Sequence, residues 1–336
     1  MAVSSQELEA KRVVVLGGCG FIGSCLCRGL INAGYRVRVF KRAETSIKRV
    51  AYLLNQMEVF IGDQTCPDEV IGAIKDAHSV IHLIHTSVPG SSMEDPVFEL
   101  QSNVASTAAW LSRLGETRLR RIIYVSSGGT VYGPPRSLPV SEDHPLNPIS
   151  VYGIAKLACE KLIAMYSELA GIDYRIARPS NAYGEGQPVD RNQGILGVLL
   201  DRIKRGKAIE IWGYGEGMRD YIHVDDVVES LLALLTHSGP SRVFNVSTGV
   251  GHSVLNVIQA FRSRAQDLPE VVHLPARGFD VPDNILDNSR LKQETGWWPK
   301  VSLDAGIDRL LAGDGATRSD IEIRISGLHI NAGVSV

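Results

Sequence analysis

Tyr152 and Lys156 have the side-chain types and the spacing for proton transfer. Residues four apart on a helix lie on one face, about one turn from each other. A phenol has an unperturbed pKa of about 10, which is too high for an efficient base at neutral pH. A neighbouring ammonium favours the phenolate, and the positive charge of an oxidised redox cofactor would act in the same direction. Tyrosine and lysine occur at this spacing on many helices by chance, but together with the glycine-rich turn at 17–23 and the segment at 125–133 the pair predicts acid–base chemistry coupled to hydride transfer at a carbinol carbon.

A glycine-rich turn near the N-terminus could bind the phosphates of such a cofactor. Residues 17–23 read GGCGFIG, directly after an apolar run and at the start of a helical pattern. In this context Gly17, Gly20 and Gly23 allow a tight turn, close approach of the backbone to a pyrophosphate, and close packing of helix on strand. The helix N-terminus adds N–H donors and a partial positive charge. The turn therefore predicts a dinucleotide site.

The end of the second predicted strand bears on the identity of that dinucleotide. An acid at this position usually accepts a hydrogen bond from the ribose 2′-hydroxyl of NAD, whereas this chain carries Lys41 and Arg42. Two bases favour a 2′-phosphate and therefore NADP(H). If both side chains are instead solvated, the pocket still accepts NAD. The choice between NAD and NADP stays open at this point.

The predicted chemistry needs elements that bring residues 17–23 and 152–156 together. Up to about residue 180 the chain alternates strand and helix patterns, with helices expected at about 21–33 and 150–170, each followed by a glycine. Strands are expected at Arg12–Leu16, Tyr35–Phe40, Glu58–Ile61, Ser79–Ile84, Arg121–Ser126 and Asp173–Ala177. Repeated βαβ units of this kind predict an α/β fold with a Rossmann-type, doubly wound parallel sheet.

After Pro179 the pattern changes, and we expect a smaller C-terminal lobe that binds the substrate. Its expected features are loops at 181–194 and 212–219, a helix at 195–205, a strand at 243–246, a turn at 249–252 and an extended stretch at 271–283. We expect a dinucleotide-binding domain with the catalytic helix over residues 1–180 and the lobe over 181–312. Some segments of the lobe would return to the sheet, and residues 313–336 would form a tail.

The composition of the 336 residues excludes several classes of partner. Hydrophobic content is 44%, charged content is 21% and the formal net charge is −2, as in an ordinary soluble protein. We therefore expect no general attraction to nucleic acid or to anionic membranes. With neither a signal-peptide pattern nor a membrane-spanning apolar run, a cytoplasmic location is predicted. The 5 cysteines show no C-x-x-C pairing, so we expect reduced packing residues and no metal site.

Together these motifs resemble the extended branch of the short-chain dehydrogenase/reductase superfamily, the NAD-dependent epimerase/dehydratase family. Both the G-x-x-G-x-x-G spacing of residues 17–23 and the Tyr152/Lys156 pair fit, and the resemblance extends over about residues 12–312. It implies contacts to the NAD or NADP cofactor from Gly17, Gly20, Phe21, Ile22, Gly23, Lys41, Arg42, Asp63, Leu83, Asn103, Tyr152, Lys156 and Pro179.

A third catalytic group is expected in the segment VSSGGTVYG at 125–133. The segment resembles S-S-S-A-T-V-Y-G of UDP-galactose 4-epimerases, in which a serine forms a hydrogen bond with the reacting oxygen. Here that serine is replaced by Gly128, so the resemblance leaves Ser127 or Thr130 to supply the hydroxyl. We favour Ser127 because it lies where the strand ends, and we expect Ser126 to be structural.

Later motifs resemble stretches that bind a nucleotide-sugar in this family. They read RPSNAYG at 178–184, EIWG at 210–213 and RDYIHVDD at 219–226. The substrate contacts that the resemblance implies are Asn181, Ile211, Trp212, Arg219, Tyr221 and Arg277. Two arginines could bind a pyrophosphate bidentately. We expect His223, Asp225 and Asp226 to cap and pack a helix, and His82 and His85 to be core or cofactor-lining residues rather than metal ligands.

The resemblance implies a nucleotide-sugar 4-epimerase, acting on a UDP-hexose or UDP-N-acetylhexosamine by transient oxidation at C4. An NADPH-dependent reductase of a 4-keto-6-deoxy nucleotide-sugar is the alternative, which Lys41 and Arg42 favour. Dehydratases carry an Asp-Glu pair where this chain has Gly128 and Gly129. A cofactor-bound module without turnover is a further class, against which the intact Tyr152/Lys156 pair argues. The resemblance also implies a homodimer.

Overall fold

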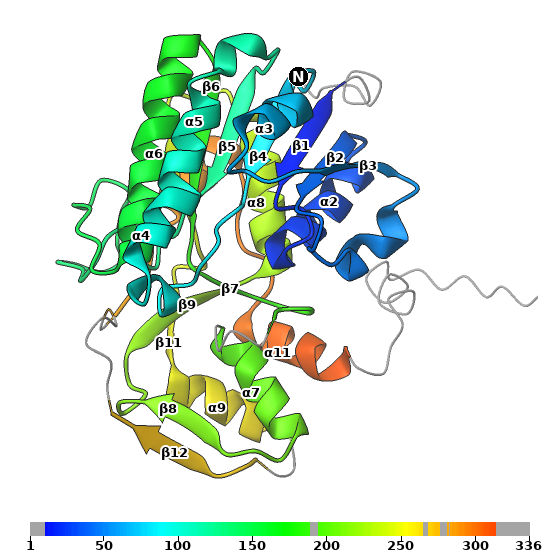
Figure 1. Cartoon of the computed structure of the whole chain (residues 1–336). Helices are drawn as coiled ribbons and strands as arrows, with labels where there is room; N and C mark the ends of the chain where they lie inside the picture. Colours follow the sequence, from blue (N-terminus) through cyan, green and yellow to red (C-terminus); the bar gives the residue numbers. More distant parts are fainter. Residues whose placement is uncertain (1–10, 189–193, 265–267, 276–280, 282, 314–336) are drawn as a thin grey trace, which may run out of the picture.

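A seven-stranded parallel sheet forms the centre of the molecule, and a smaller lobe lies at one end of it (Figure 1). The computed structural model describes residues 11–188, 194–264, 268–275, 281 and 283–313. The strand order is β10-β6-β5-β4-β1-β2-β3. The strands are β1 (Arg12–Leu16), β2 (Arg36–Lys41), β3 (Met57–Ile61), β4 (Ser79–His82), β5 (Arg121–Val125), β6 (Asp173–Pro179) and β10 (Val243–Val246). The predicted fold class is confirmed.

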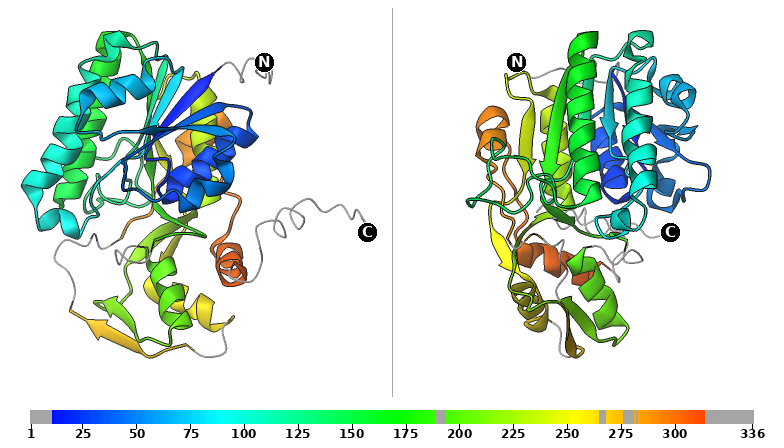
Figure 2. Two further views of the ribbon diagram at one scale, coloured as in Figure 1. Left: turned by 45° about the vertical axis from the view of Figure 1, so that its right-hand side comes forward. Right: turned by 60° about the vertical axis from the view of Figure 1, so that its left-hand side comes forward.

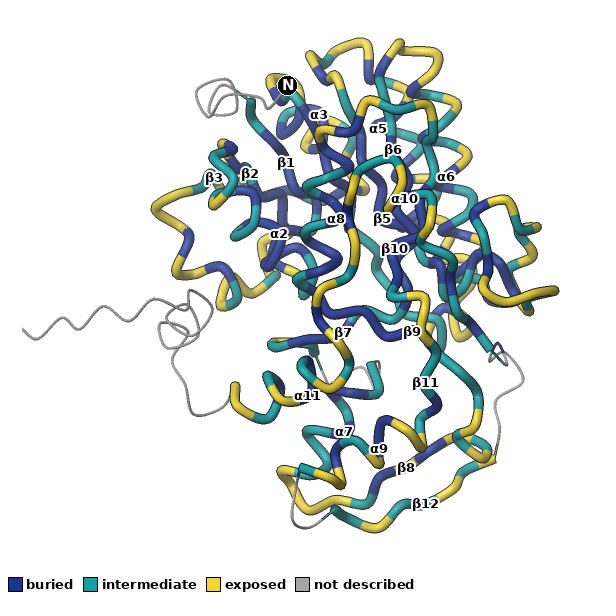
Figure 3. Tube along the Cα trace, turned by 180° about the vertical axis from the view of Figure 1, so that it is seen from behind, coloured by how far each residue is buried: buried dark blue, intermediate teal, exposed yellow. Residues whose placement is uncertain are grey.

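The apolar runs of the sequence explain why these strands are central. In β1, Val13 pairs with Val37 of β2 and with Ser79 of β4, and both pairings are parallel. Parallel sheets covered by helices on both faces need strands that are apolar throughout. Residues 13–16 are fully buried accordingly, and Figure 3 shows buried positions concentrated on these strands.

Helices cover both faces of the sheet (Figure 2). One face packs on α2 (Phe21–Asn32), α8 (Val224–Thr236) and α10 (Ser289–Thr295). The other face packs on α3 (Pro67–Ile74), α5 (Ser106–Leu111) and α6 (Val151–Ala170). A continuous helical run leads into α5, formed by α4 (Pro96–Glu99) and a π-helical stretch, η3 (Leu100–Ala105). Short 3₁₀ turns are η1 (Lys48–Leu53), η2 (Ser91–Met93) and η4 (Leu114–Glu116).

Two small sheets and three helices complete the part of the chain that the structure describes. The strands β11 (Gly251–Ser253), β9 (Met218–His223) and β7 (Asn181–Tyr183) form one sheet where the lobe joins the large sheet (Figure 1). Further out, β8 (Ile209–Trp212) pairs in parallel with β12 (Val271–Leu274). The lobe core is packed by α7 (Ile195–Lys204), α9 (Val254–Arg262) and α11 (Leu303–Ala312).

The two ends of the catalytic helix α6 are fixed by a side-chain cap at its start and by a glycine at its end. Ser150 is its N-cap, and its hydroxyl accepts a hydrogen bond from the N–H of Gly153. Gly171 ends the helix in the left-handed region, at φ 65°, a conformation that glycine adopts without a Cβ penalty. Tyr152 is therefore placed at the second residue of the helix, close to the carboxyl ends of the strands.

Some sequence predictions were wrong in the lobe. The loop expected at 181–194 begins with β7, the loop at 212–219 overlaps the ends of β8 and β9, and the turn at 249–252 overlaps β11. These strands have only three to six residues and lie beside the glycine, asparagine and proline residues that pointed to loops. Pairing rather than propensity makes them strands. As expected, β10 returns to the large sheet. The domain boundaries remain a prediction, and residues 314–336 lie outside the described residues.

Candidate active site

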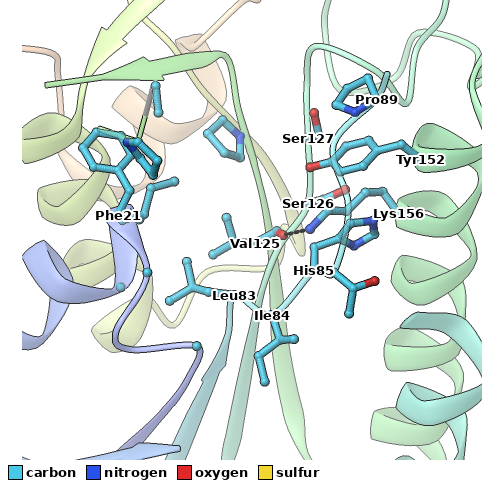
Figure 4. A pocket seen from close by; sticks show the side chains of 18 of the residues that line it. Phe21, Leu83, Ile84, His85, Pro89, Val125, Ser126, Ser127, Tyr152 and Lys156 are labelled. Carbon is cyan, nitrogen blue, oxygen red and sulfur yellow. Dashed lines mark hydrogen bonds between the residues drawn. The ribbon is translucent and has the colours of Figure 1, made fainter. Parts of the chain in front are cut away.

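A cavity of about 1190 Å³ lies along the carboxyl ends of the central strands, where the lobe begins. Its wall includes Gly17 after β1, Lys41 at the end of β2, Leu83 after β4 and Ser126 after β5. Ligands of open α/β sheets bind in this crevice. Figure 4 shows Tyr152, Lys156 and Ser127 on one side of the cavity and Phe21 on the other.

The glycine turn has the shape that a pyrophosphate requires. Gly17 has φ +89°, a conformation that L side chains rarely adopt. A Cβ on Gly23 would overlap the carbonyl oxygen of Gly17 and lie 2.8 Å from Gly18 Cα. Gly20, the N-cap of α2, supplies no side chain to its first turn, so the amides there face the cavity without a competing cap. These residues fit the phosphates of a dinucleotide.

The predicted ribose-binding residues also line the cavity. Lys41 is buried, and its Nζ donates to the carbonyl oxygen of Ala43 at 3.1 Å. Arg42 lies 2.9 Å from the carboxylate of Glu44. Arg49, which the sequence analysis missed, lines the same wall and donates from Nε to the Gly186 carbonyl at 3.1 Å. No motif marks Arg49; the η1 turn brings it there.

Asp63 lines the cavity as well, after β3. Its carboxylate accepts hydrogen bonds from the N–H and the hydroxyl of Thr65, both at 2.8 Å. Leu83 and Pro179 contribute apolar side chains to the cavity wall. Asn103 does not line the cavity. It is buried behind the wall, where its side chain accepts from the N–H of Thr86 at 3.0 Å and donates to the Glu99 carbonyl.

Tyr152 and Lys156 face the cavity together, as their spacing predicted. Lys156 Nζ lies 5.7 Å from the centroid of the Tyr152 ring and donates to the Val125 carbonyl at 2.9 Å. Burial lowers the pKa of Lys156 to about 8, against the opposing effects of Cys159, Glu160 and Glu99. The ammonium is thus engaged by a backbone carbonyl rather than by the phenol.

The phenol of Tyr152 does not have the lowered pKa that the sequence predicted. Loss of solvation in the cavity wall, and the nearby Glu99 carboxylate, raise the pKa of Tyr152 above its usual value. Without a bound cofactor, the Tyr152 phenol is therefore protonated at neutral pH. A phenolate requires additional positive charge in the cavity.

The structure explains the glycine at position 128. A Cβ there would overlap the side chain of Leu286 and lie 3.0 Å from the Arg178 carbonyl oxygen. Ser127 and Thr130 both line the cavity, and the Thr130 hydroxyl has no hydrogen-bond partner among the described residues. Ser126, which was expected to be structural, also lines the cavity. Its buried hydroxyl likewise has no hydrogen-bond partner among the described residues.

Only part of the predicted substrate set reaches the cavity. Asn181 and Arg219 line it. The Asn181 amide donates to the Asp220 carbonyl at 3.1 Å, and Arg219 donates to the carbonyls of Met218 and Val281. Ile211 and Tyr221 instead lie in the lobe core, and Trp212 is 45% exposed on the lobe surface. Alternation along β8 turns Ile211 inward and Trp212 outward. Arg277 lies outside the described residues.

The capping and packing roles predicted for His223 and Asp226 are confirmed by specific contacts. His223 caps α8, with Nδ1 accepting from the N–H of Asp225 at 3.2 Å. Asp226 accepts from the backbone N–H groups of Lys300 and Val301. His82 is buried in the core and His85 lines the cavity. Within the described ranges no three His, Cys, Asp or Glu side chains form a group that could hold a metal, and four of the five free cysteines are buried.

Comparison with known proteins decides the family. The model of the NAD dependent epimerase/dehydratase family matches residues 13–247. The chain belongs to this family. The resemblance drawn from the motifs is confirmed, and as a family member the chain is an NAD(P)-dependent enzyme. No helix in the part of the chain that the structure describes has the length and apolar character needed to cross a membrane.

Curated relatives within the family differ in reaction. The chain is 31% identical over 302 residues to a UDP-glucose 4-epimerase of Mycolicibacterium smegmatis, covering 88% of this chain and 96% of the relative. It is 30% identical over 317 residues to a dTDP-4-dehydro-6-deoxyglucose reductase of Escherichia coli, covering 90% and 98%. Sequence similarity alone therefore does not separate the two reactions.

Among solved structures, the chain is similar to the UDP-glucose 4-epimerase of Thermotoga maritima with UDP-glucose, at a TM-score of 0.84 and 29% identity, covering 90% of this chain and 97% of that one. It is also similar to the Thermus thermophilus UDP-glucose 4-epimerase in complex with NAD, at a TM-score of 0.81 and 27% identity, covering 91% and 100%. The family fold thus extends through the lobe.

Proposed function

We propose that the protein is a nucleotide-sugar 4-epimerase that acts on a UDP-hexose or UDP-N-acetylhexosamine with a bound nicotinamide dinucleotide. The observation that carries the proposal is the convergence of Tyr152, Lys156 and the hydroxyl of Ser127 on the cavity that the glycine turn opens. The UDP-glucose 4-epimerases among the relatives and solved structures support it.

The dinucleotide would be held along the wall already described. The first turn of α2 would bind the pyrophosphate, Lys41, Arg42 and Asp63 the adenosine half, and Leu83 and Pro179 the apolar part near the reaction. When bound, the nicotinamide ring supplies an acceptor and donor for a hydride.

The protein's own residues would manage the proton. Tyr152 takes the proton of the C4 hydroxyl during oxidation and returns it after the sugar has turned within the cavity. Ser127, or Thr130, forms a hydrogen bond with the reacting oxygen. Lys156 has two further N–H groups besides the one on the Val125 carbonyl, and these can orient a ribose hydroxyl and stabilise the phenolate.

Two side chains at the other end of the cavity would hold the sugar nucleotide. Arg219 would bind the diphosphate and Asn181 would assist it; we propose Arg277 as a second arginine on the same group. A chain with a formal net charge of −2 must provide such charge locally.

Turnover assays test the proposal. The purified protein is incubated with UDP-glucose, UDP-N-acetylglucosamine and a 4-keto nucleotide-sugar. We expect the C4 epimer to form with no net change in NAD(P)H absorbance, and Tyr152→Phe to remove this activity by at least about 100-fold. Stoichiometric consumption of NADPH would reject the epimerase, and no reaction with any substrate would favour a module without turnover.

A reductase of a 4-keto-6-deoxy nucleotide-sugar is the second candidate. Lys41, Arg42 and Arg49 line the cavity and carry positive charge, which suits the 2′-phosphate of NADPH. A curated relative is a reductase of a 4-keto-6-deoxy nucleotide-sugar. Net reduction of the 4-keto substrate with NADPH would establish it.

We also propose a homodimer through the helices around α6. Apolar side chains are exposed there on neighbouring elements, including Val97 and Phe98 of α4 and Met165 and Leu169 of α6. Val97 and Phe98 lie near the start of α6, where Phe98 also lines the cavity, and Met165 and Leu169 lie near its end. Exposed apolar side chains along a helix can serve as a contact surface. Sedimentation equilibrium should give twice the chain mass, and a monomer would reject the proposal.

A further inference from the structure

A histidine and a glutamate lie next to the catalytic tyrosine, and the proposed function gives them no role. His85 follows β4, and Glu99 is the last residue of α4. His85 Nε2 lies 2.6 Å from Glu99 Oε1, with the two side chains 6% and 1% exposed. The Nδ1 atom of His85 has no hydrogen-bond partner among the described residues. Figure 4 shows His85 in the cavity wall beside Lys156.

The imidazole of His85 packs directly on the reacting side chain. The centroids of the His85 and Tyr152 rings are 4.4 Å apart, with the rings inclined at 66°. The backbone N–H of Tyr152 donates to the Ser92 hydroxyl at 3.1 Å. An edge-to-face contact at this distance restricts the ring plane. The phenol is therefore fixed by His85 on one side and by its place on α6 on the other.

The pair of His85 and Glu99 carries a net negative charge at neutral pH. Burial and the Lys156 cation lower the pKa of His85 to about 4, so its imidazole is neutral at pH 7 and donates from Nε2. Burial alone would raise the pKa of Glu99, but interactions with His85 and Ser87, together with the Lys156 cation, outweigh it and hold that pKa below its usual value. The result is an ionised carboxylate beside a neutral ring.

Among the described residues, four titratable groups contact Tyr152 or interact with it electrostatically. They are Lys156 on α6, Glu99 on α4, His85 after β4 and Tyr124 on β5. Among them Lys156 is the single cation and Glu99 the single anion at neutral pH. Tyr124 has its pKa raised by burial and stays neutral.

We propose that His85 and Glu99 are positioning residues that act through Tyr152: the imidazole holds the phenol ring in place, and the Glu99 carboxylate opposes loss of the phenol proton. The inference rests on the proposed function, because that function makes Tyr152 the acid–base group. In the resting enzyme, the pair of His85 and Glu99 keeps Tyr152 protonated. Phenolate then forms only while enough positive charge lies in the cavity to offset Glu99.

The first test needs no substrate. Spectra of ¹⁵N-histidine-labelled protein are recorded from about pH 5 to pH 8, and His85→Phe identifies the His85 signals among those of the 9 histidines. We expect a neutral ring protonated at Nε2 over the whole range. An imidazolium at pH 7 would overturn the proposal, because its charge would cancel that of Glu99.

The second test uses turnover. Glu99→Gln keeps the shape and the acceptor for His85 but removes the charge, so the acid limb of the kcat–pH profile should move to lower pH by about one unit. Glu94→Gln, an exposed glutamate five residues away, is the matched control and should superimpose on the wild type. A Glu99→Gln profile coincident with the wild type would overturn the proposal.

Ring contact is tested with two substitutions of His85. His85→Phe keeps an aromatic ring against Tyr152, and His85→Ala removes it. We expect kcat of His85→Ala to fall about tenfold further than that of His85→Phe, with KM little changed; equal values would remove the positioning role. Circular dichroism and dinucleotide binding establish that each variant is folded. If no substrate is turned over, the proposed function fails while the spectra still decide the charge of His85.

Discussion

The side chain of Leu286 occupies the space that a Cβ on Gly128 would need. Leu286 is fully buried, in a small core with Val131, Tyr132 and Val140. The backbone of Gly128 is fixed on both sides, since its N–H donates to the Pro179 carbonyl at 2.9 Å and its carbonyl accepts from the Asn284 amide at 3.2 Å. A side chain at 128 therefore cannot be accommodated by a backbone shift alone.

This packing predicts the effect of restoring a serine. Gly128→Ser should lower the free energy of unfolding by about 1–3 kcal/mol through overpacking. Combined with Leu286→Ala, the loss should be smaller than the sum of the two single losses by about 1 kcal/mol, because the two changes share one space. Urea unfolding measures all three variants. Gly129→Ser is the control, since a Cβ there meets nothing closer than 3.9 Å; additive losses would contradict the packing explanation.

The hydroxyls on either side of position 128 should share the third catalytic role. Ser127→Ala should lower kcat by about 100-fold or more, as does loss of one preorganised hydrogen-bond donor. Thr130→Val should have a smaller effect if Ser127 is the main donor. The double variant should be the slowest. Unchanged turnover after removal of both hydroxyls would contradict the assignment.

Lys156 should be required for turnover while lowering the free energy of unfolding. Its pKa of about 8 in the folded protein is below the usual 10.5, so the unfolded chain binds this proton more tightly. Lys156 therefore lowers the free energy of unfolding by its full amount below about pH 8. This loss becomes smaller as the pH rises from about 8 to 10.5. Lys156→Met should raise the free energy of unfolding at pH 7 by up to about 3 kcal/mol while removing turnover.

The pH dependence provides the check on Lys156. The gain in Lys156→Met should shrink as the pH approaches 10.5, which urea unfolding at several pH values would show. Lys161→Met, on the exposed side of the same helix, should change stability by less than about 0.5 kcal/mol. A gain that is the same at all pH values would mean that packing rather than charge is responsible.

Cofactor preference should depend on Lys41 and Arg42. Replacing both with alanine should weaken NADPH binding by about 10-fold to 100-fold, because charge-assisted hydrogen bonds to a phosphate are lost. NADH binding should change by less than about threefold. Fluorescence titration with both cofactors measures this, and Lys48→Ala, an exposed lysine outside the cavity wall, is the control. Equal weakening for both cofactors would argue against a 2′-phosphate site.

Local chemistry explains which parts of the site could be predicted from the sequence. The glycine turn, the Ser150 cap and the Gly171 stop act within a few residues, so positions 17–23 and the helix with Tyr152 were located correctly. The parallel strands were found because burial on both faces requires continuous apolar runs.

Long-range packing explains what could not be predicted. Arg49 and the pairing of His85 with Glu99 depend on how segments after β2, β4 and α4 approach one another. Trp212 was placed at the substrate because of its motif, whereas the alternation of β8, set by the lobe core, turns it to solvent. Leu286, which explains Gly128, is more than a hundred residues away in the chain.

The position of β10 in the sheet also has a consequence for folding. It pairs with β6 at the sheet edge, yet β7, α7, β8, β9 and α8 lie between the two strands in the chain. Closing so long a loop costs entropy that only the completed pairing repays. One part of the lobe, from β7 to β9, is thus inserted between two paired strands of the large sheet, and the other part follows β10. We therefore expect sheet and lobe to unfold cooperatively rather than as two independent units.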